Sequence, residues 1–304
     1  MATRSGSAAL AGATNAGKST LFNRLVGERL SIATPKAQTT RLSIKGIVIA
    51  TSAEDDRTEI VVLDLPGIFR PRRALDRAMV AAAWRGAQAA DVILFVVDAK
   101  ARLSSEVSEI ARRLAEMARP VWLVLNKVDL VPKPSLLPLA ASLNALSAFG
   151  KTFMLSAATG DGVSDLSLAL AGAMPEGPHL YPAGQISDLT ERNLAAEIVR
   201  EQIFLQCGDE VPYDAAVETE SWQEQKDGSV RIGGVVTVAR GGQKAILIGA
   251  GGRRIRMIGT RARAVLAASL GRTVHLVLRV EERPGWDEDQ RRITALGLRE
   301  PQER

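Results

Sequence analysis

Eight residues near the start of the sequence match the pattern of a phosphate-binding loop. The segment Gly12-Ala-Thr-Asn-Ala-Gly17-Lys18-Ser19 lies between a short apolar run and a helical stretch. Its glycines allow backbone N–H groups to surround phosphates, the Lys18 ammonium can reach β- and γ-phosphate oxygens, and the Ser19 hydroxyl can bind Mg²⁺. The alternative is a turn rich in Gly and Ala that binds nothing, and the position between strand and helix disfavours it. The expected nucleotide contacts here are Gly12, Asn15, Ala16, Gly17, Lys18, Ser19 and Thr20.

A second motif, Asn126-Lys127-Val128-Asp129, indicates which base the nucleotide carries. The Asp129 carboxylate can accept hydrogen bonds from the ring N–H and the exocyclic amine of guanine, whereas adenine has no such adjacent donor pair. Backbone N–H groups further along the chain can bind the guanine carbonyl oxygen. Standing alone, the motif could be an ordinary polar strand end, but together with the phosphate-binding loop it favours GTP over ATP. The expected base contacts are Asn126, Lys127, Asp129, Ser156, Ala157 and Ala158.

Two segments between these motifs could sense the γ-phosphate. Asp64-Leu-Pro-Gly67 ends an apolar run, so the Asp64 carboxylate can hold Mg²⁺ through water and the Gly67 N–H can bind the γ-phosphate. Thr39-Thr40-Arg41 lies in a polar loop, where Thr40 should complete the Mg²⁺ shell only when a triphosphate is bound. Two adjacent threonines by themselves are more often a solvated loop. We expect metal contacts at Ser19, Thr40 and, through water, Asp64, and catalytic contacts at Lys18, Thr40 and Gly67.

A glycine-rich turn in the second half of the chain precedes a basic helix. The segment Leu247-Ile-Gly-Ala-Gly-Gly-Arg-Arg-Ile255 matches the Ile-Gly-x-x-Gly-x-x-Ile core of a KH domain. Such glycines let two helices meet closely and bring the backbone near nucleic-acid phosphates. One helical face is predicted to pack, and the arginines fall outside it. The packing face comprises Ile255, Ile258, Ala262, Val265, Leu266 and Ser269.

A solvated arginine surface is the alternative, and the charge disfavours it only together with the glycine turn and the family resemblance given below. Residues 240–279 hold nine Lys or Arg and no acidic residue. The middle loop positions, Ala250 and Gly251, lack the basic residue of many KH loops, so the phosphate contacts should shift to neighbouring arginines. Aromatic residues are only 4% of the chain, which disfavours recognition by base stacking. The expected RNA contacts are Lys244, Gly249, Ala250, Gly251, Gly252, Arg253, Arg254 and Arg256.

Alternating apolar runs and helical stretches predict the elements that position these motifs. The predicted first domain is α/β, with a mostly parallel sheet covered on both faces and an antiparallel strand at its edge, and the second is α+β with a hairpin at Asp227-Gly228. The predicted domains are residues 1–174 and 191–304, joined by a linker at 175–190. Strands are expected at Ala8–Ala11, Leu42–Ala50, Ile60–Leu65, Val92–Asp98, Val121–Asn126, Phe153–Ser156, Ala215–Glu224, Val230–Ala239 and Thr273–Val280.

Composition excludes several other classes of protein. The 304 residues contain one cysteine, Cys207, so no internal disulfide is expected, and two histidines that form no metal or catalytic pattern. No apolar run approaches the roughly 20 residues of a membrane helix, and no signal peptide is evident. A cytoplasmic protein is expected. The net charge of +5 fits a nucleic-acid partner, with peripheral membrane contact left open.

The combined motifs resemble the translation-factor-like GTPases and, among them, the Era family. The resemblance rests on Gly12–Asn23, Lys36–Arg41, Asp64–Ile68, Asn126–Asp129 and the KH core, and it covers about residues 7–173 and 190–298. It implies a P-loop GTPase domain, followed by a type II KH domain, that hydrolyses GTP to GDP with Mg²⁺. It further implies a monomer that binds single-stranded ribosomal RNA of the small subunit on a 30S-type particle. Asn15 could add a K⁺ site, and Ile68 replaces the water-orienting glutamine of many signalling GTPases.

Other functions remain open from the sequence. A GTPase of the same class could act on tRNA or on the large subunit. Alternatively, GTP could only stabilise one shape of an RNA-binding protein, with hydrolysis incidental, and the absent glutamine keeps that hypothesis alive. A P-loop kinase is disfavoured by the guanine motif, and no phosphoacceptor pocket is identifiable.

Overall fold

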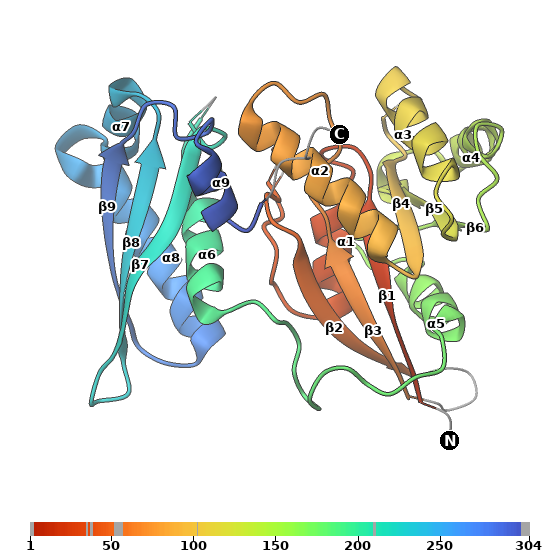
Figure 1. The fold of residues 1–304 in the computed structure, drawn as a ribbon, viewed down its shortest axis with the longest axis horizontal. Helices are drawn as coiled ribbons and strands as arrows, with labels where there is room; N and C mark the ends of the chain where they lie inside the picture. The colour runs from red at the N-terminus through yellow and green to blue at the C-terminus, as the bar shows by residue number, and fades with distance from the viewer. Residues whose placement is uncertain are drawn as a thin grey trace. The chain divides into compact units, whose positions relative to one another are not determined.

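The computed structural model describes residues 3–34, 36, 39–51, 57–101, 103–208 and 211–298 (Figure 1). The chain divides into two compact units. The first comprises the described residues of Met1–Arg72, Asp76–Asp188 and Gly297–Arg304, and the second comprises those of Arg73–Leu75 and Leu189–Leu296.

The first unit contains a six-stranded sheet in the order β2-β3-β1-β4-β5-β6. The β2 strand pairs with β3 in antiparallel fashion and the remaining pairs are parallel, which confirms the predicted α/β class. The strands are β1 (Arg4–Ala11), β2 (Ile44–Thr51), β3 (Arg57–Asp64), β4 (Val92–Asp98), β5 (Val121–Asn126) and β6 (Lys151–Met154). The helices are α1 (Lys18–Val26), α2 (Ala74–Ala89), α3 (Ser105–Ala115), α4 (Leu136–Asn144) and α5 (Val163–Ala173), with short 3-10 turns η1 (Val128–Leu130) and η2 (Lys133–Ser135).

Helices cover both faces of this sheet, and β4 and β5 accordingly consist of continuous apolar runs that end in one polar residue. The α1 and α5 helices lie on one face, and α2, α3 and α4 lie on the other (Figure 1). Their apolar side chains form one core on each side of the sheet. Residues Val92–Val97 of β4 are all buried, as expected of a parallel strand between two helical layers. The carboxyl ends of the parallel strands therefore share one edge, where their loops form the ligand site typical of such sheets.

The predicted position of the last strand of this sheet was wrong by two residues. We expected Phe153–Ser156, but β6 ends at Met154, whose partner is Leu125. The Ser156 N–H donates instead to the Asp161 carbonyl, which turns the chain into a loop.

The segment 175–188, expected to lie in a linker, runs along the first unit. The buried Glu59 carboxylate of β3 accepts hydrogen bonds from the Ser5 hydroxyl at 2.8 Å and from the backbone N–H groups of Leu180 and Tyr181 at 2.7 and 3.1 Å. Further along, the Ile47 N–H of β2 donates to the Ile186 carbonyl at 2.9 Å. These bonds fasten the segment to the outer edge of the sheet.

The second unit is α+β, as predicted. It contains α6 (Glu191–Gln206), β7 (Ala215–Glu224), β8 (Val230–Val238), α7 (Gly241–Ile248), a 3-10 turn η3 (Ala250–Gly252), α8 (Arg253–Leu270), β9 (Val274–Glu282) and α9 (Gln290–Ala295). The β7 and β8 strands form the predicted antiparallel hairpin around Gly228, and β9 runs parallel to β8. Side chains of α6 and α8 pack with the sheet in one core.

The buried stripe of α8 differs from the prediction at its end. Ile258, Ala262 and Leu266 are buried as expected, whereas Ser269 is exposed. Leu270 packs against the core instead, because it lies four residues after Leu266 on the same face.

Candidate nucleotide and RNA sites

The phosphate-binding loop joins β1 to the start of α1. Gly12 has a φ of 147°, and a Cβ there would collide with the Val96 carbonyl oxygen, so only glycine fits. Gly17, with a φ of 91°, caps the amino terminus of α1. The Lys18 ammonium donates to the Gly12 and Ala13 carbonyl oxygens at 3.1 and 2.8 Å. Burial lowers the pKa of Lys18 to about 8, which a bound anion would oppose.

Three hydroxyl groups surround the Asp64 carboxylate at the end of β3. The Ser31 and Thr40 hydroxyls donate to Asp64 Oδ2 at 2.6 and 3.2 Å, and Ser19 Oγ lies 2.7 Å from Thr40 Oγ1. Asp64 Oδ1 is buried and, among the described residues, has no hydrogen-bond partner. Burial raises the pKa of the Asp64 carboxyl. The Ser19 and Thr40 hydroxyls, together with an Asp64 carboxylate whose Oδ1 has unused lone pairs, fit the preference of Mg²⁺ for oxygen ligands.

The segment after Asp64 lies against the phosphate-binding loop. A Cβ on Gly67 would fall 2.6 Å from Thr14 Cγ2 and 3.0 Å from Thr14 Cα, so glycine permits the close approach. The Ile68 N–H donates to the Gly12 carbonyl at 3.0 Å. The Ile68 side chain is buried in the core, so it cannot orient a water molecule.

A cavity of about 300 Å³ connects these groups. Its lining includes residues of the phosphate-binding loop, Gly67, Lys127 and the loop that precedes β2. The structure thus brings together residues that the sequence places in four separate segments. The predicted site residues in this lining are Asn15, Gly17, Lys18, Ser19, Thr20, Thr40, Gly67 and Lys127.

Asn126 links three loops around the expected position of the base. Its side-chain amide donates to the Ala16 carbonyl at 3.0 Å, and its Oδ1 accepts from the Lys127 and Ala157 N–H groups at 2.8 and 2.9 Å. Lys127 has a φ of 65°, and its ammonium contacts the Asn15 carbonyl at 2.8 Å and Asp98 Oδ2 at 2.7 Å. The side chains of this motif therefore fix the loops to one another.

The other base-motif residues differ in the donors and acceptors that they leave available. The Asp129 side chain lies exposed on η1. The Ser156 and Ala157 N–H groups donate to protein acceptors, the Asp161 carbonyl and Asn126 Oδ1. Of the three predicted donors in this described loop, only the Ala158 N–H has no protein acceptor. Ala158 is thus the candidate donor to a guanine carbonyl oxygen.

Sequence reasoning missed three polar residues around this site. Ser31 holds Asp64, Asn23 holds Ser31 by three hydrogen bonds, and the Arg24 guanidinium donates to the Ala157 and Ala158 carbonyls. Their only sequence signal was the position of polar side chains near α1. Such a pattern equally describes a solvated helix face.

The glycine turn of the second unit joins α7 to α8. A Cβ on Gly249 would fall 2.8 Å from Arg254 Cβ, and Gly251 and Gly252 have φ values of 59° and 74°. These positions let the two helices meet closely, as the motif predicted. Lys244 lies on α7, while Ala250 is exposed at the tip of the turn.

The arginines that begin α8 contact only backbone carbonyls in the described contacts. Arg253 Nε donates to the Ala250 carbonyl at 3.3 Å, Arg254 Nη1 donates to the Ile246 carbonyl at 2.9 Å, and Arg256 donates to the carbonyls of Gly251 and Gly252. A guanidinium has five N–H donors, so each retains further donors for phosphate. Among the described residues, no carboxylate forms an ion pair with these three arginines.

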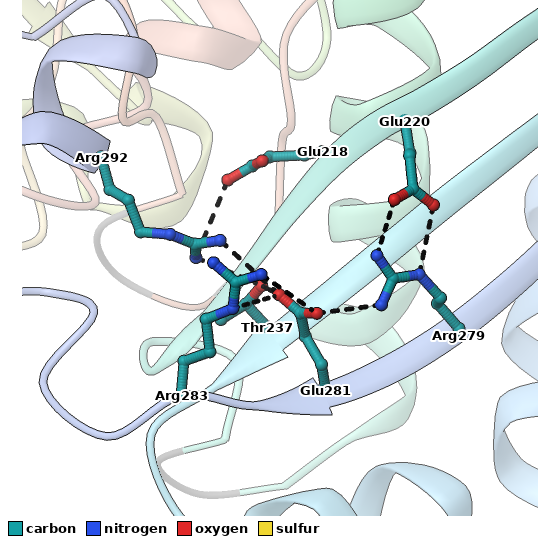
Figure 2. Close-up of polar contacts among 7 residues, drawn as sticks. All are labelled: Glu218, Glu220, Thr237, Arg279, Glu281, Arg283 and Arg292. Carbon is teal, nitrogen blue, oxygen red and sulfur yellow. Dashed lines mark hydrogen bonds and ion pairs between the residues drawn. The ribbon is translucent and has the colours of Figure 1, made fainter.

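Three other arginines of this unit, Arg279, Arg283 and Arg292, have acidic partners instead (Figure 2). Arg279 forms two hydrogen bonds with Glu220, at 2.7 and 3.2 Å, and a third with Glu281 at 2.9 Å. Glu281 also contacts Arg283 at 2.8 Å and Arg292 at 3.6 Å. These ion pairs neutralise Arg279, Arg283 and Arg292, whereas the described contacts of the arginines at the turn between α7 and α8 include no carboxylate.

The comparisons with known proteins agree with this geometry. Two family models match, "50S ribosome-binding GTPase" over residues 7–127 and "KH domain" over residues 210–286. A GTPase Era from Rhizobium meliloti (strain 1021) is 51% identical over 296 residues, which cover 97% of this chain and 93% of that protein. This chain belongs to the Era family of GTPases. A GTPase Era from Brucella suis biovar 1 (strain 1330) is 48% identical, with 97% and 94% of the two chains covered.

Solved structures of Era share the whole fold. A variant of Era from Aquifex aeolicus bound to GDP and AlF₄⁻ is 34% identical, covers 97% of this chain and 99% of its own, and has a TM-score of 0.91. Era in complex with MgGDPNP and nucleotides 1506–1542 of 16S ribosomal RNA gives the same identity, coverage and TM-score. Like its Era relatives, this protein is a GTPase, and it carries a carboxyl-terminal KH domain. None of the described helices has the length and apolar character needed to cross a membrane.

Proposed function

We propose that this GTPase is a nucleotide-controlled switch that binds single-stranded ribosomal RNA of the small subunit. The observation that carries the proposal is the convergence of Lys18, Ser19, Thr40 and Gly67 around one cavity, with the Asp64 carboxylate hydrogen-bonded to Thr40. The same chain carries a KH turn whose arginines have no carboxylate among their described contacts. Solved Era structures hold GDP with AlF₄⁻, or MgGDPNP with 16S ribosomal RNA, which supports GTP, GDP and Mg²⁺ as the ligands here.

The residues of the nucleotide site divide into those that contact phosphate, those that hold Mg²⁺ and those that contact the base. Lys18 neutralises β- and γ-phosphate oxygens, while Ser19 and Thr40 offer hydroxyl ligands to Mg²⁺ and Asp64 holds it through water. Gly67 donates its N–H to the γ-phosphate, and Asp129 accepts from guanine. Mg²⁺ held by these residues would supply positive charge against the negative charge that develops during phosphoryl transfer. The remaining contacts are the backbone groups of Gly12, Asn15, Ala16, Gly17, Thr20 and Ala158, with Asn126, Lys127, Ser156 and Ala157 holding their loops.

We further propose slow intrinsic hydrolysis that depends on K⁺. Because the Ile68 side chain is buried, the chain offers no glutamine to orient water at that position. Intrinsic turnover should be on the order of 10⁻³ s⁻¹ or below. The exposed Asn15 side chain is the candidate K⁺ ligand. Single-turnover hydrolysis that is equally fast in K⁺ and Na⁺ would remove Asn15 from this role.

The proposed RNA site is the turn at Gly249–Gly252 with Lys244, Arg253, Arg254 and Arg256. Support comes from the absence of neutralising carboxylates in their described contacts and from the 16S fragment in the solved Era complex. This protein would bind a 30S-type particle in the cytoplasm as a monomer. The family model whose name mentions the 50S particle matches only residues 7–127, which form the nucleotide-binding part of the chain. We take residues 1–174 and 191–304 as the two domains, with 175–190 between them.

The experiment that tests the switch is a measurement of reciprocal coupling. RNA affinity is measured for the nucleotide-free, GDP and GTP-analogue forms, and analogue affinity is measured with and without RNA. A switch should change both affinities by the same factor, about 5- to 150-fold. Thr40→Ala should remove most of the difference and leave GDP binding nearly unaltered. Identical RNA affinity in all three forms would contradict the proposal, even if both ligands bind.

A further inference from the structure

Ser31 occupies a position that the motifs of the nucleotide site do not include. Its hydroxyl donates to Asp64 Oδ2 at 2.6 Å, the shortest hydrogen bond among the described contacts of that carboxylate. Both side chains are buried, with 3% and 0% of their surfaces exposed. Oδ1 of the same carboxylate has no partner among the described residues. A carboxylate fixed through one oxygen presents the other in a defined direction.

Ser31 itself is fixed by α1. Asn23 Oδ1 accepts from the Leu30 and Ser31 N–H groups at 3.0 Å each, and Asn23 Nδ2 donates to the Ser31 carbonyl at 2.8 Å. These three bonds define the backbone of Ser31 on both sides of its Cα. Because α1 begins at Lys18, the support of Ser31 is continuous with the phosphate-binding loop.

Thr40 also bonds Asp64 Oδ2, but its role differs from that of Ser31. Thr40 Oγ1 lies 2.7 Å from Ser19 Oγ and is expected to turn toward Mg²⁺ when triphosphate binds. The Asn23 clamp requires no nucleotide, since all of its partners are protein atoms. Ser31 can therefore hold Asp64 in the diphosphate and triphosphate states alike.

We propose that Ser31, held by Asn23, is a positioning residue that orients the Asp64 carboxylate for Mg²⁺ in both nucleotide states. The inference rests on the proposed function, because it requires Mg²⁺ to bind beside Asp64. Loss of a group that orients a metal site commonly costs about 10- to 100-fold in metal affinity, and because Asp64 holds Mg²⁺ through water, the loss of its Ser31 partner should fall near the lower end of that range. Loss of the Ser31 hydroxyl should therefore weaken Mg²⁺ retention and leave metal-free nucleotide binding intact.

The test measures dissociation of a fluorescent GDP, and separately of a fluorescent GTP analogue, across a Mg²⁺ titration of the full chain. Ser31→Ala should raise the Mg²⁺ concentration for half-maximal retention at least about tenfold for both nucleotides. In Ser31→Thr, which keeps a hydroxyl, the Mg²⁺ concentration for half-maximal retention should stay within about threefold of the wild-type value. In EDTA, affinity for GDP should match wild type in every variant. Thr40→Ala should change the Mg²⁺ requirement for the triphosphate only.

Ser5→Ala provides a matched control. Ser5 also donates from a buried serine to a buried carboxylate of β3, Glu59, at 2.8 Å, but at the other end of the strand. It should cost similar stability without moving the Mg²⁺ midpoint. If Ser31→Ala does not fold, Ser31→Cys, with a weaker donor of similar size, carries the same expectation.

Three results would overturn the inference. They are an unchanged midpoint in Ser31→Ala, an equal loss of affinity with and without Mg²⁺, and an equal shift in Ser5→Ala. A wild-type protein that retains GDP equally well with and without Mg²⁺ would instead contradict the proposed Mg²⁺ site itself.

Discussion

Asn126→Ala should separate the guanine motif's structural task from its recognition of the base. This side chain makes three hydrogen bonds, to the Ala16 carbonyl and to the Lys127 and Ala157 N–H groups, and it is 1% exposed. A neutral buried hydrogen bond contributes about 1 kcal/mol net, so removing all three should cost about 3 kcal/mol. If the whole cost appears in binding, GDP affinity falls about 100-fold.

The cost divides between nucleotide affinity and folding stability, so both must be measured. Titration with a fluorescent GDP gives the first, and urea denaturation without nucleotide gives the second. Asn144→Ala is the control, because Asn144 bonds the Ala140 carbonyl and Thr152 Oγ1 on α4 and β6 rather than the nucleotide loops. It should leave GDP affinity unchanged. A combined loss below about 1 kcal/mol in Asn126→Ala would refute the claim that its amide holds the three loops together.

Three further predictions use other parts of the chain. Asp129→Asn should weaken GTP binding by several kcal/mol and favour xanthosine triphosphate, whose edge offers an acceptor in place of a donor. Competition binding between the two nucleotides measures this change, and an unchanged preference for GTP would contradict the role of Asp129. Gly252→Asp should lower RNA affinity in gel shifts and leave GTP binding intact. Gly271→Asp, at the other end of α8 with a similar φ of 63°, should leave RNA affinity unchanged. Equal losses in the two variants would contradict RNA binding at the turn between α7 and α8. Glu59→Ala should lower the free energy of unfolding, measured by urea denaturation, by about 3 kcal/mol, because three donors lose their acceptor. A change below about 0.5 kcal/mol would show that Glu59 does not hold segment 175–188 against the sheet.

The sequence by itself determined the features whose parts are contiguous along the chain. The phosphate-binding loop, the guanine motif and the KH turn each consist of neighbouring residues, and their backbone geometry depends on glycines at fixed spacing. Continuous apolar runs such as Val92–Val97 predicted buried parallel strands, since only burial on both faces suits them. The order of these motifs was sufficient to indicate the family.

Only the tertiary structure decided which groups meet across long separations. Ser31 and Asp64 lie 33 residues apart, Arg279 and Glu220 lie 59 apart, and Glu59 and Leu180 lie 121 apart. Serine, arginine and glutamate are common surface residues, so their types do not reveal their partners. Strand register and loop path select the partner, and at the buried carboxylates of Asp64 and Glu59 burial then makes the hydrogen bonds obligatory. For the same reason the available donor, Ala158 N–H, could be recognised only after Asn126 had been seen to occupy its neighbour.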